Sequence, residues 1–356
     1  MADTRAQFLA ELDKVAPQIR EAFERAVQDI RSTAQARAID EAIKRAIETG
    51  DIARGVQEVT AAIQLGQEFF APLDRQIAEA FYQGGVWQLS QLPKSVSTGS
   101  PQGQALIVRF DGRHPTAEAW TRRHSAALIT EITDDTEKVI RETLTEAVEQ
   151  GRPYRRVTRD LIGRTEGNQR TGGLIGLQSR QARAVRAARG DLEALDARYF
   201  TRKLRDRRFD RTVRAAIEAG TPLSQADIER ITGRYADRLL QARGRTISRS
   251  EGNKSMNAGR GEGVVQMIER GEILAEHVTI IWDATPGPRT RDSHRALNGQ
   301  TIKWGEFFVS PVTGALMRWP HDEDAPAEEV VNCRCSARFR VDWKAVMLWR
   351  RQQRAA

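Results

Sequence analysis

The residues most suited to chemistry lie between positions 281 and 341. Both cysteines of the 356-residue chain, Cys333 and Cys335, fall in this stretch, together with two of its five histidines, His294 and His321. Thiolates and imidazoles are zinc ligands, and two cysteines separated by one residue of a strand share one face. The sequence therefore makes these four residues candidate zinc ligands. A Cys-x-Cys pair is a weak zinc signal, so a role as small apolar core residues is the alternative.

Catalysis by this stretch would need further groups that the sequence does not show. A Cys–His nucleophile requires a thiolate activated by His294 and an oxyanion site. Four aspartates near the two histidines could instead form a metal-dependent nuclease centre. Their surroundings are rich in proline, glycine and asparagine, where aspartate is common because it stabilises turns. We therefore predict that the chain is not an enzyme. The four aspartates are Asp283, Asp292, Asp322 and Asp324.

A second candidate set is basic and lies in the middle of the chain. Arginines recur every three residues from position 180 to 189, and basic residues cluster again from 202 to 214. Guanidinium groups suit contacts with phosphates, and no base-reading motif accompanies them, so the prediction is non-specific binding of double-stranded DNA. The alternative is a solvated face in which Asp206 and Asp210 form structural ion pairs with neighbouring arginines. The candidate DNA contacts are Arg180, Arg183, Arg186, Arg189, Arg202, Lys203, Arg205, Arg207, Arg208 and Arg211.

Composition is consistent with such a partner. The net charge is +8 and the pI is near 9.8, which favours a polyanionic neighbour. Two cysteines do not make a disulfide framework and would be reduced in a bacterial cytoplasm. No run of about 18 apolar residues occurs, and the first residues do not form a basic-then-apolar signal peptide, so we expect no membrane role.

The elements that must position these residues are mainly helical. Apolar residues recur every three or four positions from Phe8 to Ile30, which predicts an amphipathic helix that Pro17 should bend or break unless the helix begins there. The alternating patterns of residues 276–283 and 331–341 predict strands, and the second places both cysteines on one face. A glycine-rich stretch at 252–263 lacks the Gly-Lys-Ser/Thr of a phosphate-binding loop and predicts close helix packing or a hinge, without a ligand.

The predicted fold is therefore mainly α with a small α+β C-terminal module, and with elongated helical N-terminal and central regions. A stretch rich in proline, serine and glycine predicts a linker or exposed loop, and a short strand follows it at 105–110. The predicted regions are a helical one at 1–92, the linker at 93–104, a central helical region with the basic stripes at 105–271, the α+β module at 272–342 and a basic helical tail at 343–356.

The order of motifs in the C-terminal module resembles that of phage head morphogenesis proteins, the Mu F-like minor head proteins. The resemblance extends upstream through residues 174–190, 202–210 and 235–249 and covers roughly residues 105–341. It implies an internal role for the motif residues, whose side chains would hold a loop-rich module in one shape. The residues that match the family's Arg-Thr-Arg…His and terminal motifs are Arg289, Arg291, His294, Asn332, Cys333, Arg334 and Cys335.

The resemblance implies a minor head (minor capsid) protein of a tailed phage, prophage or phage-derived particle. Such a protein would act in head morphogenesis as a portal-associated adaptor, with portal, major capsid or scaffolding protein as partners, and would contact packaged DNA. It would be made in the host cytoplasm and then reside in the virion, in the head interior or at the portal vertex. No cofactor is required, with zinc as the one candidate. The alternatives are a metal-dependent nuclease or toxin-like effector carried in the head, or a non-specific DNA-binding protein.

Overall fold

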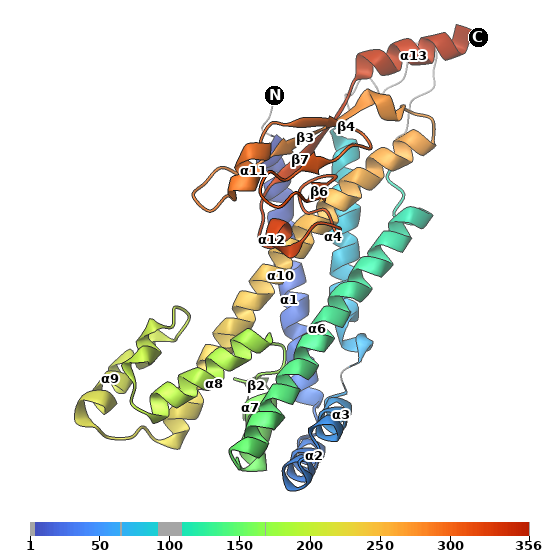
Figure 1. The fold of residues 1–356 in the computed structure, drawn as a ribbon. Helices are drawn as coiled ribbons and strands as arrows, with labels where there is room; N and C mark the ends of the chain where they lie inside the picture. The colour runs from blue at the N-terminus through green and yellow to red at the C-terminus, as the bar shows by residue number, and fades with distance from the viewer. Residues whose placement is uncertain (1–3, 65, 92–108, 168, 356) are drawn as a thin grey trace. The chain divides into compact units, whose positions relative to one another are not determined.

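The computed structural model describes residues 4–64, 66–91, 109–167 and 169–355, which are mainly helical (Figure 1). Within these residues, no helix has the length and the apolar composition that crossing a membrane requires. The helices are α1 (Thr4–Thr33), α2 (Ala36–Thr49), α3 (Ile52–Ala62), α4 (Ala71–Ser90), α6 (Pro115–Glu149), α7 (Tyr154–Ile162), α8 (Ser179–Glu193), α9 (Asp210–Ala219), α10 (Gln225–Glu269), α11 (Asp292–Leu297), α12 (Ala327–Val330) and α13 (Trp343–Ala355).

Small antiparallel sheets complete the fold. One has the strand order β4-β3-β7, and two others are the hairpins β1-β2 and β5-β6. The prediction of a mainly α fold with a small α+β C-terminal module is confirmed, although the hairpin β1-β2 in the central region was not expected. The strands are β1 (Arg164–Glu166), β2 (Gln169–Thr171), β3 (Val278–Asp283), β4 (Thr301–Lys303), β5 (Phe308–Val309), β6 (Leu316–Met317) and β7 (Ser336–Val341).

The first helix follows its sequence pattern but not the expected break. The stripe from Phe8 to Ile30 is buried, as an amphipathic helix requires. The expected break at Pro17 is wrong, because α1 continues through this residue. Pro17 lies on the exposed face, where water can bind the carbonyl group that loses its helical partner. The predicted linker at 93–104 lies outside the described residues, as does most of the predicted strand at 105–110, and Arg109 and Phe110 belong to no strand.

The chain divides into two compact units, each made of segments that are distant in sequence. We call them the first unit (residues 1–20, 74–125 and 246–356) and the second unit (residues 21–73 and 126–245). The first unit therefore holds the C-terminal module, and the second holds the basic stripes.

The core of the first unit gathers around the sheet β4-β3-β7 (Figure 1). The central strand β3 pairs with both neighbours, so that Ile280 lies opposite Ile302 on one side and opposite Phe339 on the other. Trp282 is fully buried and contacts the ring of Phe308 edge-on, with ring centroids 5.2 Å apart. The sheet thus shares one apolar core with residues of α10 and of α4.

The glycine-rich part of α10 is a helix-packing surface. The helix is continuous from Gln225 to Glu269, so residues 252–263 form no hinge. A β-carbon on Gly259 would overlap the carbonyl oxygen of Phe81, and one on Gly84 would lie 2.8 Å from the Cα of Met256. Helices α4 and α10 therefore approach so closely that their backbones touch, which glycine alone permits. Of the two predicted uses of these glycines, close packing is the one observed.

Two buried arginines of the second unit bind backbone carbonyl groups. Arg31 donates to the carbonyl oxygens of Gly173 and Ile175, each at 2.6 Å, and Arg243 donates to that of Gly176 at 3.0 Å. Burial lowers the pKa of Arg31 to about 10, which shows that its charge is poorly solvated. These bonds fix the loop before α8, since a buried carbonyl group without a donor would be costly.

Candidate functional site

Three of the four candidate zinc ligands come together in the first unit. Nδ1 of His294, on the short helix α11, lies 3.4 Å from Sγ of Cys333 and 3.5 Å from Sγ of Cys335. The three ligand atoms all lie within 4.8 Å of one another, and all three residues are buried. Both cysteines come just before β7 rather than within it, yet both side chains point inward as the alternating pattern predicted. We call this group the Cys–His cluster.

The other nitrogen of His294 faces a carboxylate. Its Nε2 lies 3.0 Å from Oε2 of Glu329, which is itself buried. The carboxylate accepts hydrogen bonds from the hydroxyl groups of Ser293 (2.9 Å), Ser310 (2.6 Å) and Thr313 (2.7 Å). Burial raises the pKa of Glu329, but these three donors outweigh burial and leave the pKa below its usual value. Glu329 is therefore a firmly held carboxylate that faces the imidazole ring at ion-pair distance, although Nε2 forms no hydrogen bond in this geometry.

The fourth candidate ligand, His321, lies outside the Cys–His cluster. Its Nε2 is 2.9 Å from the carbonyl oxygen of Cys333, and its backbone adopts a left-handed conformation, with φ of 65°. Burial lowers its pKa to about 3, so the ring is neutral near pH 7. The side chain thus supports the turn that carries the first cysteine and does not face the thiols.

The two thiols differ in acidity. A hydrogen bond with Cys333 and a further one with His294 lower the pKa of Cys335, against the opposing effect of burial. Burial, together with the neighbouring Cys335, raises the pKa of Cys333.

The remaining family-motif residues divide into two groups. Arg291 donates to the carbonyl oxygen of Val331 at 2.6 Å, and Asn332, which has a φ of 58°, donates from its backbone to Ser250 Oγ at 3.0 Å. These contacts fit the expected role of holding the loops in place. Arg289 and Arg334 have exposed side chains instead.

The four aspartates considered for a nuclease centre are each paired with arginine. Arg318 binds Asp322 and Asp324, with distances of 2.6 Å and 2.8 Å. Asp283 pairs with Arg5 at 2.9 Å and with Arg338 at 3.3 Å, and Asp292 pairs with Arg295. Carboxylates that are already neutralised in this way are poor ligands for a catalytic metal ion, because the arginine would have to leave first.

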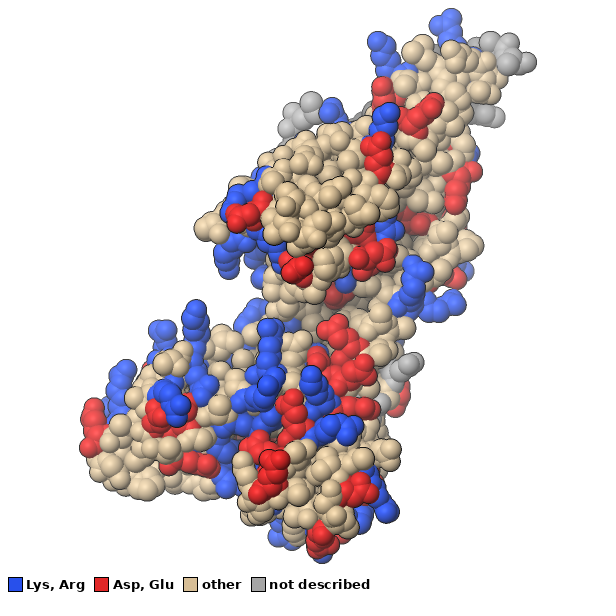
Figure 2. Space-filling view, viewed as in Figure 1, with Lys and Arg blue, Asp and Glu red and all other residues tan. Residues whose placement is uncertain are grey.

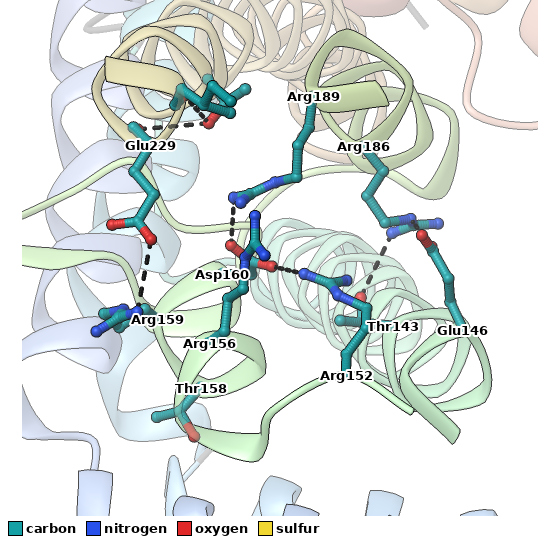
Figure 3. Close-up of polar contacts among 12 residues, drawn as sticks. Thr143, Glu146, Arg152, Arg156, Thr158, Arg159, Asp160, Arg186, Arg189 and Glu229 are labelled. Atoms are coloured by element: carbon teal, nitrogen blue, oxygen red, sulfur yellow. Dashed lines mark hydrogen bonds and ion pairs between the residues drawn. The ribbon is translucent and has the colours of Figure 1, made fainter. Parts of the chain in front are cut away.

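The first basic stripe lies on α8 in the second unit, and two of its four arginines form short ion pairs with neighbouring helices. Arg186 pairs with Glu142 (3.1 Å) and Glu146 (2.7 Å) on α6, and Arg189 pairs with Asp160 (2.6 Å) on α7 (Figure 3). Arg186, Arg189 and Asp160 line a small cavity together with Arg159 and Glu229. Arg180 and Arg183 are exposed, and Arg183 lies 3.9 Å from the carboxylate of Glu142. The alternative that we weighed, structural ion pairing, thus describes Arg186 and Arg189.

The second basic cluster shows the same division. Arg205 pairs with Asp210 at 2.8 Å, and Arg202 pairs with Asp191. Asp206 is buried and binds the exposed Arg208 at 2.6 Å. Among the described residues that the sequence made candidate DNA contacts in this cluster, three are exposed and form no ion pair. They are Lys203, Arg207 and Arg211.

Glu329 is the functional candidate that the sequence alone did not reveal. It is one of 48 acidic residues and lies three positions before Asn332, in a stretch without any metal-binding pattern. Only the fold brings it to His294, 35 residues earlier in the chain. No local signal in the sequence could have identified it.

The comparisons with known proteins agree with the motifs. Residues 207–338 match the family model of phage Mu protein F like protein. The matched region includes α9, α10 and the whole Cys–His cluster. Neither a curated protein nor a solved structure matches the chain. The Mu F-like resemblance is therefore confirmed over these residues, and its extension upstream to residue 105 stays a prediction.

Proposed function

Because the chain carries the phage Mu protein F-like region at residues 207–338, we propose that it is a minor head protein that joins the portal of a tailed phage, prophage or phage-derived particle. The family match is the observation on which the proposal rests, since it supports a role as a phage head protein. The adaptor role is supported by an exposed apolar surface, and contact with packaged DNA by exposed basic residues.

The apolar surface lies on the hairpin β5-β6 of the C-terminal module. Phe308 and Met317 are paired across the hairpin and buried, so their neighbours Val309 and Leu316, which also pair, point outward. These two side chains are 55% and 56% exposed, and Val312 in the connecting turn is 68% exposed. Figure 2 shows few charged side chains over this part of the module. Apolar side chains gathered on one hairpin favour a protein partner over solvent.

Removing this surface is expected to weaken portal binding. The double variant Val309→Lys with Leu316→Glu replaces the outward apolar pair with opposite charges, which keeps a favourable cross-strand contact. Co-expression with the cognate portal protein, followed by size exclusion and mass analysis at low and high salt, measures the complex. We expect a salt-resistant complex of defined stoichiometry for the parent chain and a loss of at least tenfold in affinity for the variant, which corresponds to about 1.4 kcal/mol.

A matched control places the same two charges elsewhere in the first unit. Met347→Lys with Leu348→Glu alters exposed apolar residues of α13, which are 62% and 55% exposed. This variant is expected to bind the portal like the parent. A parent chain that elutes alone at both salt concentrations would contradict the portal role and would direct attention to the major capsid or scaffolding protein.

The basic surface of the second unit supports contact with packaged DNA. Lys203, Arg207 and Arg211 lie close together in sequence around α9, and all three are exposed. Figure 2 shows basic side chains interspersed with acidic ones over this part of the molecule. Each cation that neutralises a phosphate releases counterions, so binding weakens as salt is added. Contacts of this kind carry no sequence information, which suits a protein that meets any packaged genome.

The triple variant Lys203→Gln, Arg207→Gln and Arg211→Gln is expected to bind duplex DNA more weakly and with a shallower salt dependence. The slope of log affinity against log salt should fall by about 0.9 for each lost phosphate contact. Fluorescence anisotropy of a labelled duplex over a salt series measures it. The control removes three exposed arginines of the first unit, namely Arg113, Arg122 and Arg123, and leaves the same net charge. An equal loss in the control would contradict a specific basic surface.

The second candidate function is a metal-dependent nuclease or toxin-like effector, which the gathered Cys–His cluster keeps open. It predicts turnover of nucleic acid by the purified chain, abolished by His294→Ala. The arginine pairing of the four aspartates disfavours this candidate.

A further inference from the structure

We propose that His294, Cys333 and Cys335 bind one Zn²⁺ ion through Nδ1 and the two Sγ atoms, with a water molecule in the fourth position. The site would lie between α11 and the turn before β7, and would tie these two segments of the C-terminal module together. It is independent of the proposed portal role, because metal binding is a property of the isolated chain.

The spacing of the ligand atoms fits tetrahedral zinc. With Zn–S bonds of about 2.3 Å and Zn–N bonds of about 2.0–2.1 Å, neighbouring sulfur and nitrogen ligands are separated by roughly 3.6 Å. The observed separations are 3.4 Å for Cys333 and 3.5 Å for Cys335. Both sulfur–nitrogen separations therefore match those around a single zinc ion, and the two sulfurs lie within 4.8 Å of each other.

The shared nitrogen distinguishes a metal site from simple thiol hydrogen bonding. Nδ1 of His294 has one lone pair, so it can accept a hydrogen bond from only one thiol at a time. Both sulfurs nevertheless lie at the same distance from it, within 0.1 Å. A metal ion accounts for this symmetry, because it binds all three atoms at once.

Residues around the Cys–His cluster contact the proposed ligands, as metal sites require. A histidine that binds zinc through one nitrogen usually presents the other to a carboxylate, which fixes the ring and its tautomer. Glu329 takes this position at Nε2, and its own oxygens are held by three hydroxyl groups. The backbone amide of Cys335 also donates to Sγ of Cys333 at 3.3 Å, which fixes the position of this sulfur.

The same geometry disfavours a catalytic nucleophile. Cys333 and Cys335 are 3% and 2% exposed, so a substrate could not reach either sulfur without a rearrangement of the module. Activated cysteines in enzymes are partly exposed. Two buried thiols around one anchored imidazole instead match the closed surroundings of a metal ion.

Metal analysis of the full-length chain tests the proposal. The protein is purified without chelator, and zinc is measured by mass spectrometry after dialysis; we expect about one ion per chain. Replacement by Co²⁺ should then give the absorption of cobalt–thiolate charge transfer. A chain that takes up neither metal after reconstitution in reducing buffer would overturn the proposal.

Single-residue variants distinguish the proposed zinc ligands from the residues that support them. Cys335→Ser and His294→Ala should each abolish stoichiometric zinc and the cobalt–thiolate band. His321→Asn tests the fourth candidate ligand: because His321 supports the turn that carries Cys333, this variant should bind zinc more weakly but still reach one ion per chain at saturating zinc. Loss of zinc from this variant even at saturating zinc, in a chain with an unchanged circular dichroism spectrum, would overturn the three-ligand site in favour of one with four protein ligands.

Glu329→Gln keeps the proposal testable if the ligand variants fail to fold. The amide preserves the shape and two of the side-chain contacts, so the module should fold. As a positioning residue, Glu329 should alter zinc affinity by about 10–100-fold without changing the stoichiometry at saturating zinc. Competition with a chromophoric chelator measures this affinity, and an affinity equal to the parent's would overturn the assigned role of Glu329.

Discussion

Replacing Gly259 with alanine is expected to destabilise the first unit by about 3 kcal/mol, at the upper end of what overpacking a core costs. The added methyl group would overlap the carbonyl oxygen of Phe81 and lie 3.1 Å from the amide nitrogen of Gly85. Both are backbone atoms of α4, which cannot rotate aside as a flexible side chain could. Helices α4 and α10 would have to move apart, and urea unfolding followed by tryptophan fluorescence should show a lower midpoint.

Gly263→Ala is the matched control, about one turn further along the same helix. Its added methyl group would lie 3.5 Å from the carbonyl oxygen of Gly85 and 3.7 Å from the side chain of Gln88, which are ordinary contacts. Alanine is favoured over glycine in a helix by about 1 kcal/mol, so this variant should be at least as stable as the parent. Equal losses in the two variants would contradict the close approach of the helices as the reason for Gly259.

The second large effect is expected at Arg260. Replacing it with alanine should lower the free energy of unfolding of the first unit by about 3–5 kcal/mol. The side chain is almost completely buried, and its guanidinium carbon lies 4.5 Å from the ring centre of Trp87, 5.0 Å from that of Phe8 and 5.1 Å from that of Phe339. Truncation would remove these cation–π contacts and leave a cavity between segments of the first unit. The unfolding midpoint in urea measures the loss.

Arg260→Met separates the volume of the side chain from its charge. Burial lowers the pKa of Arg260 to about 9, so keeping the charge in the core is itself unfavourable. Methionine fills most of the space but leaves Gln88 and Asn257 without their donor. We expect a loss of stability smaller than that of the alanine variant. If both variants lose the same amount, the cation rather than its volume holds the three rings together.

The helices and the C-terminal strands could be predicted because their signals are local. The apolar stripe from Phe8 to Ile30 is periodic enough to override Pro17, which only removes one hydrogen bond on the exposed face. The patterns at 276–283 and 331–341 alternate, and the strands within them, β3 and β7, pair with each other over their whole length, although residues 331–335 form no strand. Periodicity identifies an element and its inward face, but it does not identify the partner of that face.

The parts of the site that could not be predicted depend on long-range contacts. His294, Cys333 and Cys335 were candidates by residue type, but His321 was an equally good candidate, and only the turn geometry separates it. The basic residues of the two stripes look alike in the sequence, but their surroundings differ. Arg186 binds carboxylates of a helix some 40 residues earlier in the chain, whereas Lys203 faces solvent. Whether a charge is used internally is decided by a partner that the local sequence does not show.

Because the first unit is made of segments that are distant in sequence, it can be completed only late in protein synthesis. Phe8 needs Trp87 and Arg260 as neighbours, yet residues 21–245 are made between the first and last segments of that unit. At about 5–20 residues per second, the ribosome takes roughly 10–45 s to synthesise residues 21–245. During this interval the apolar stripe of the first segment has no permanent cover and needs a chaperone or a temporary partner. A translation product that stops early would keep that stripe exposed, so proteases could remove it before it joined a particle.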